Sequence, residues 1–74
     1  MNEATFNVYG RLLVRLARLP GGMWEAAEIG YEGKRRPILE VLVPDHARVE
    51  DLPTYLEAAF HEMARPGESI VRVG

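Results

Sequence analysis

The sequence contains no cysteine and only one serine, Ser69. Without cysteine there is neither a disulfide framework nor a thiolate metal site, which is typical of proteins that work in a reducing cytoplasm. No stretch approaches the roughly 18 consecutive apolar residues that span a bilayer. The opening MNEATFNVYG also lacks the basic start and apolar run of a signal peptide. These absences predict a soluble, cytoplasmic protein with no membrane partner.

Repeats and low-complexity segments are also absent, and the 74 residues fit a single domain, 1–74. A chain this short buries only about 60% of its unfolded surface, so its core needs reinforcement. The net charge is −2, but residues 1–37 carry six bases and four acids whereas residues 38–74 carry three bases and seven acids. This asymmetry suits a dipolar surface that steers a partner, although inert domains often show a difference of the same size.

The segment VEDLPTYLEAAFHEMARPG predicts a helix over about 52–64. Asp51 suits the N-cap, Pro53 fits only the first turn, and the sequence Arg-Pro-Gly at 65–67 is a stop signal. Apolar residues recur at spacings of three and four, which makes one stripe along the helix. The members of this stripe are Leu52, Tyr55, Leu56, Ala59, Phe60 and Met63.

Three further segments predict strands. The apolar run ILEVLVP indicates a strand over about 38–43, and SIVRVG indicates a closing strand over about 69–73. MWEAAEIGYEG is assigned to a strand over about 23–31, because Gly30 and Gly33 would interrupt a helix there.

The stretch RLLVRLARLPGG can be either helix or strand. As a helix it aligns Arg11, Arg15 and Arg18 along one stripe, but Gly10 and Pro20 would leave little more than two turns. As a strand over about 5–19, its even-numbered residues from Phe6 to Leu16 form an unbroken small or apolar face. We therefore favour a strand, with Pro-Gly-Gly at 20–22 as the following turn.

The predicted fold class is α+β, in the order β-β-β-α-β: a small antiparallel sheet with one amphipathic helix packed on one face. One helix covers only one face, yet Leu13 lies on the other face of the first strand. The strand over 38–43 is apolar on both sides, with Leu39 and Val41 on the same side. An uncovered apolar face predicts a protein partner or a homodimer. The alternative is that the long hairpin curls, or the N-terminus folds, over that face.

The stretches FNVYGR, EGKRRP and LPTYLEAAFHEMA together span most of the chain. They resemble a family of very small, uncharacterised bacterial proteins with an F-x-V-x-G-R start, a G-K-R-R-P turn and an F-H-E helix end. The resemblance implies a compact α+β domain of bacterial or phage origin without an assigned activity. It provides no functional residues to carry over.

No catalytic signature is present. The sequence His61-Glu-Met-Ala-Arg65 begins like the zinc-protease motif His-Glu-x-x-His, but Arg65 stands where the second imidazole is needed. Gly30 to Lys34 has the wrong spacing for a phosphate-binding loop, and no serine or threonine follows the lysine. We therefore predict a protein that is not an enzyme and takes no metal, no cofactor and no small-molecule substrate.

The strongest basic cluster is Lys34-Arg35-Arg36, with Arg11 and Arg15 expected on a neighbouring strand. Such a cluster binds either a nucleic-acid backbone or an acidic protein surface. The plain alternative is a solvated turn whose charges prevent edge-to-edge aggregation. The overall acidity of the chain counts against nucleic acid.

The leading hypothesis is a non-enzymatic protein-binding module, a small bacterial or phage regulator that inhibits a larger nucleic-acid-targeting complex as anti-CRISPR proteins do. The second hypothesis is direct binding of an RNA or DNA backbone by the basic turn and strand. The sequence leaves open whether Trp24 belongs to the core or to an interface. The predicted partner-binding residues are Arg11, Leu13, Arg15, Lys34, Arg35, Arg36, Leu39 and Val41.

Overall fold

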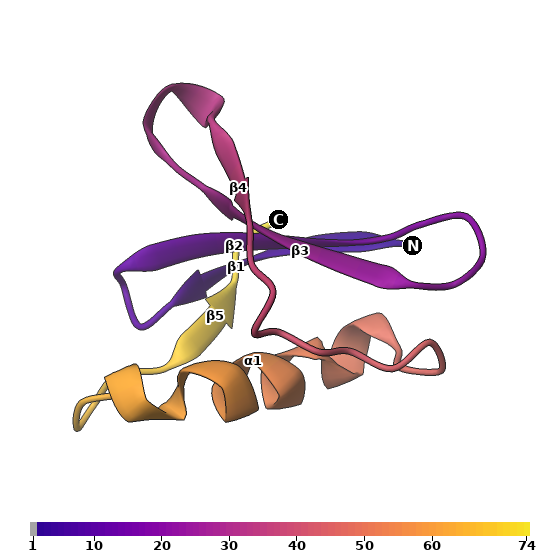
Figure 1. Cartoon of the computed structure of the whole chain (residues 1–74). Coiled ribbons are helices and arrows are strands. Elements are labelled where there is room, and N and C mark those ends of the chain that lie inside the picture. Colours follow the sequence, from indigo (N-terminus) through magenta and orange to yellow (C-terminus); the bar gives the residue numbers. More distant parts are fainter. Residues whose placement is uncertain (1) are drawn as a thin grey trace.

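A computed structural model describes residues 2–74 of the chain, apart from the side chain of Tyr31. It forms a five-stranded antiparallel sheet in the order β4-β3-β2-β1-β5, with one α-helix (Figure 1). The α+β class, with the helix directly ahead of the last strand, agrees with the expectation. The elements are β1 Glu3–Val8, β2 Leu12–Arg18, β3 Trp24–Ile29, β4 Arg35–Pro37, α1 Leu52–Phe60 and β5 Ile70–Arg72, with 3₁₀ turns at Tyr31–Gly33, Val49–Asp51 and His61–Met63.

The first long strand expected, over 5–19, is a hairpin of β1 and β2. Tyr9 and Gly10 both have positive φ, 57° and 72°, and reverse the chain, with the Arg11 amide donating to the Val8 carbonyl. β2 covers most of the stretch that sequence alone left between helix and strand, so the helical alternative is wrong. The register pairs Val8 with Leu12, so even-numbered residues of both strands face the same side of the sheet.

The turn between β2 and β3 falls at the Pro-Gly-Gly expected for it. Gly21 and Gly22 have φ values of 98° and 100°, which glycine adopts readily and other residues adopt only with strain. The Leu19 amide donates to the Met23 carbonyl and closes the turn. β3 then pairs with β2 so that Ala26 lies opposite Leu16, again on the even-numbered face.

The strand expected at 38–43 does not form, and the fourth strand is the short β4 that precedes it. The exposure of this segment does not follow the period of two of a strand, because the neighbouring residues Leu39 and Glu40 are both exposed. Val41 is buried, whereas Leu39 and Leu42 are 84% and 79% exposed. Ile38 still donates its amide to the Ala26 carbonyl, and beyond it this apolar run is irregular.

The core is one cluster of buried residues that includes even-numbered residues of the sheet and two residues of α1. Leu52 and Leu56 of α1 are fully buried and belong to one cluster with the sheet residues, while α1 lies on one side of the sheet in Figure 1. The buried members of the cluster are Ala4, Phe6, Val8, Tyr9, Val14, Leu16, Ala26, Val41, Leu52 and Leu56.

No helix in residues 2–74 is long and apolar enough to cross a membrane.

Candidate docking surface

Odd-numbered residues of β1, β2 and β5 form the outer face of the sheet, on the side away from the core. Asn7 pairs with Leu13 on one side and with Val71 on the other, so these three side chains make one row. Leu13 and Val71 are 40% and 52% exposed, and Val73, just beyond β5, is 55% exposed. The outer face therefore presents apolar side chains to solvent, as the sequence predicts for Leu13.

Two adjoining hollows, each of about 350 Å³, lie between the β1–β2 turn and the β3–β4 hairpin, and Leu13 of the outer face lines the first of them. The first is partly apolar and the second is basic, and they share Glu28 and Gly30. The residues that line the first are Asn7, Gly10, Arg11, Leu12, Leu13, Glu28, Ile29 and Gly30. Those that line the second are Glu28, Gly30, Lys34, Arg35 and Arg36. The fold thus brings five of the predicted partner-binding residues to one region.

The basic hollow is built at the tip of the β3–β4 hairpin, which rises from the sheet on the side away from α1 (Figure 1). Glu28 accepts a hydrogen bond from Arg36 at 2.9 Å; this bond, and then the charge of Glu28, raise the pKa of the Arg36 guanidinium. Lys34 and Arg35 are exposed and make no ion pair with any residue that the structure describes. Two cations at the tip therefore remain available to a partner.

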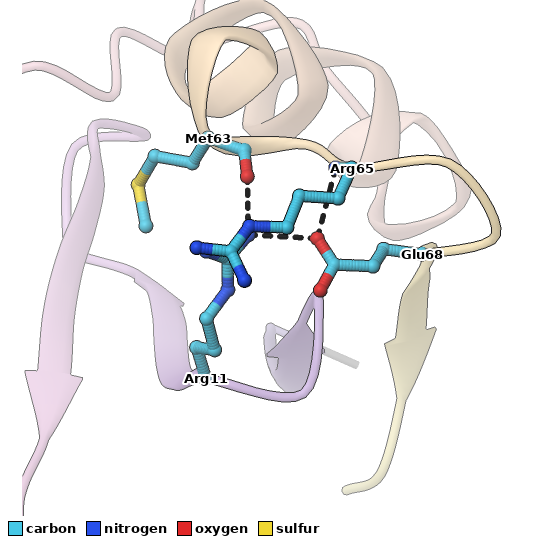
Figure 2. Close-up of polar contacts among 4 residues, drawn as sticks. All are labelled: Arg11, Met63, Arg65 and Glu68. Atoms are coloured by element: carbon cyan, nitrogen blue, oxygen red, sulfur yellow. Dashed lines mark hydrogen bonds and ion pairs between the residues drawn. The ribbon is translucent and has the colours of Figure 1, made fainter.

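Arg11 has a second, structural role at the far end of the first hollow. Its guanidinium donates to the Met63 carbonyl and, at 2.7 Å, to Glu68, which also accepts from the Arg65 amide (Figure 2). The same guanidinium lies 6.0 Å from the centre of the Tyr9 ring. Arg11 therefore ties the β1–β2 turn to the end of the helical region, a contact between positions that no sequence pattern connects.

Arg15, Leu39 and Val41 do not line these hollows. Arg15 lies on the outer face but forms an ion pair with Glu3 of the adjacent strand. Val41 is only 8% exposed and packs in the core, so its assignment to an exposed sheet face is wrong. Leu39 is highly exposed, but it belongs to the irregular segment after β4 and not to a strand.

A second polar cluster escaped the sequence reasoning. Arg18, Arg48 and Arg72, from β2, the segment before α1 and β5, surround one hollow beside Trp24. The signal that could have revealed it is the position of Arg18, which continues the even-numbered inward series that runs from Phe6 to Leu16. A charged residue at an inward position needs polar partners. Within residues 2–74, no three His, Asp or Glu side chains are grouped so that they could hold a metal ion.

Comparison with known proteins identifies a family but no activity. A family model described as Domain of unknown function (DUF7661) matches residues 3–73. No curated protein and no solved structure matches the chain. The match agrees with the expected uncharacterised family of small proteins.

Proposed function

The chain belongs to the DUF7661 family of unknown function. From the geometry of its surface we propose that it is a non-enzymatic protein-binding module. In this proposal, α1 packs on one face of the sheet and closes the core, while the outer face and the tip of the β3–β4 hairpin dock onto a partner. The observation that carries the proposal is the adjoining pair of hollows, one partly apolar and one basic.

The chemistry of the two hollows defines the partner. Leu13 and Ile29 offer an apolar surface, and Lys34 and Arg35 place positive charge next to it. A protein segment that carries an acidic side chain beside an apolar one matches both, because the apolar group is desolvated while the charges attract at the rim. The sequence-based hypothesis of an inhibitor of a nucleic-acid-targeting complex is a finer form of this proposal.

Binding of a nucleic-acid backbone is the competing function, and the geometry supports it less. A backbone site needs several cations along one track, since each neutralised phosphate adds to affinity. Here Arg11 is bound to Glu68, Arg15 to Glu3 and Arg36 to Glu28. Three of the basic residues are thus paired with separate carboxylates. Lys34 and Arg35 remain, and two cations neutralise few phosphates.

The test is capture from a bacterial lysate with the tagged chain, with and without nuclease, comparing the wild type with Leu13→Glu. Leu13 is 40% exposed and outside the core, so the substitution leaves the fold intact, which circular dichroism checks. We expect a nuclease-resistant protein that the wild type retains and Leu13→Glu loses. With that protein purified, Arg35→Glu should weaken binding by about tenfold, and more at low salt than at high salt.

The matched control is Met23→Glu, which places the same charge on an exposed apolar residue in the β2–β3 turn. This variant should retain the partner. Equal capture by the wild type and Leu13→Glu would reject the outer face as the docking surface. Recovery of nuclease-sensitive nucleic acid that Lys34→Ala and Arg35→Ala abolish would establish the competing function instead.

A further inference from the structure

A third hollow, of about 590 Å³, lies on the core side of the sheet at the end opposite the β1–β2 turn. Its volume falls within the range of small-molecule sites. One wall is the even-numbered face of the sheet and the other is the segment leading into α1. The lining residues are Asn2, Arg18, Trp24, Arg48, Val49, Glu50 and Arg72.

The charge of this hollow differs from that of the whole molecule. Three arginines and one glutamate line it, although the chain has a net charge of −2. Glu50 lies 3.8 Å from Arg48, and both side chains are largely exposed, so their attraction is weak. Bringing three guanidinium groups from distant parts of the chain to one concave surface creates a positive potential that attracts an anion.

Three groups of the hollow are held in place before any ligand binds. Arg72 donates its Nε–H to the Gly74 carbonyl at 2.9 Å. Arg18 donates to the Ala47 carbonyl and, at 2.8 Å, to the Asp45 carbonyl, and its guanidinium carbon lies 4.8 Å from the centre of the Trp24 ring. Trp24 itself donates its indole N–H to the Ala47 carbonyl at 3.3 Å. A guanidinium has more N–H donors than these two carbonyls use, so Arg18 keeps capacity for a ligand oxygen. Little side-chain ordering is needed at this part of the hollow.

We propose that this hollow binds a small organic phosphate, with its phosphate group between Arg48, Arg72 and Arg18 and its organic part against Trp24 and Val49. The planar guanidinium fork matches two oxygens of a phosphate group, which favours arginine at such sites. The indole and the valine supply apolar walls, so the ligand carries an organic group and not phosphate alone. This site is separate from the docking surface, and it departs from the sequence-based expectation of no small-molecule ligand.

Trp24 is the single tryptophan of the chain, so its fluorescence and its indole N–H signal in ¹H–¹⁵N spectra report on this hollow. The full chain is titrated at constant ionic strength with inorganic phosphate, ribose 5-phosphate and adenosine 5′-monophosphate, with ribose and adenosine as uncharged controls. We expect saturable changes at Trp24 with the two organic phosphates, weaker binding of inorganic phosphate, and none with ribose or adenosine.

The decisive variant is Arg48→Gln. The Arg48 side chain is highly exposed, and its backbone amide, which donates to Asp51, is unaffected by the substitution. We expect about tenfold weaker binding of both organic phosphates, the usual effect of losing one charge-assisted hydrogen bond. Arg65→Gln is the control, because Arg65 is exposed and lies outside this hollow.

Three outcomes would overturn the proposal. The first is the absence of a saturable response at Trp24 to either organic phosphate, with folding confirmed by the ¹H–¹⁵N spectrum. The second is equal affinity of the wild type and Arg48→Gln. The third is an equal response to sodium chloride at matched ionic strength, which would show charge screening in place of a site. Binding of inorganic phosphate as tight as that of the esters would overturn the assignment of the organic part to Trp24 and Val49.

Discussion

The guanidinium of Arg18 stacks on the indole of Trp24, 4.8 Å from the ring centre, and both groups donate to the same carbonyl, that of Ala47. This arrangement fixes the segment before α1 against the β2–β3 hairpin. Within residues 2–74 Arg18 has no acidic partner, and its inward position in β2 is stabilised by two backbone carbonyls and an aromatic ring. Trp24 thus contributes to the packing between the sheet and this segment.

Arg18→Lys is expected to lower the free energy of unfolding by about 1–2 kcal/mol. Lysine keeps the positive charge but cannot donate to two carbonyls in the planar geometry of the guanidinium, and it stacks less well on the indole. Urea unfolding followed by circular dichroism measures the effect. Arg48→Lys, in which an exposed arginine is replaced, serves as the control and should change stability by less than about 0.5 kcal/mol. Equal effects of the two substitutions would contradict the role assigned to Arg18.

The ion pair of Arg11 and Glu68 should contribute about 0.5–1 kcal/mol of coupling energy in a double-mutant cycle of Arg11→Ala and Glu68→Ala. Their side chains are 34% and 24% exposed, so water and salt partly screen the attraction. The coupling is measured by urea unfolding at low salt and again at about 1 M sodium chloride, where we expect it to fall. A coupling energy near zero at low salt would show that only the bond from Arg11 to the Met63 carbonyl ties the turn to the helix end.

The sequence pattern predicted the direction of side chains in β1 and β2 but not the turn between them. A turn that pairs Val8 with Leu12 keeps even-numbered residues on one face of both strands, so period-two alternation continues through the reversal. Turns of positive φ usually show asparagine, aspartate or glycine at both central positions. Here the first is Tyr9, so Gly10 was the only local sign of a turn.

The segment 38–43 shows the limit of composition as a guide to strands. Its β-branched residues, Ile38, Val41 and Val43, have high strand propensity, but such propensity reflects fit to a partly buried pleated surface and is overridden by tertiary packing. The Lys34 carbonyl hydrogen-bonds to the residue just after β3, and the Ile38 amide hydrogen-bonds to β3. Pro37, which lacks an N–H group, therefore faces the free edge of β4.

The contacts of Arg11 and Arg18 with carbonyls distant in the chain have no local sequence signal.

Truncation of Val41 should change the free energy of unfolding more than truncation of Leu42, because the two neighbours differ in burial. Val41→Ala is expected to destabilise the fold by about 1–2 kcal/mol through loss of buried methyl groups and the remaining cavity. Leu42→Ala should change stability by less than about 0.5 kcal/mol, since that side chain is 79% exposed. Urea unfolding of both variants is the measurement. A greater loss for Leu42→Ala would contradict the burial of Val41 and the exposure of Leu42 in this segment.

Gly21 and Gly30 lie before and after β3 and differ in backbone conformation. Alanine substitutions at these two positions therefore measure the cost of backbone strain. Gly21 has a φ of 98° and nothing within 4 Å of an added Cβ, so Gly21→Ala should destabilise the fold by about 1–3 kcal/mol through backbone strain alone. Gly30 does not adopt positive φ, and an added Cβ would meet the Lys34 carbonyl oxygen at 3.6 Å, an ordinary contact. Gly30→Ala should therefore be neutral or stabilise by up to about 1 kcal/mol, because alanine restricts the unfolded chain. Thermal and urea unfolding of the pair test this difference, and equal stability of the two variants would contradict the conformation of the β2–β3 turn.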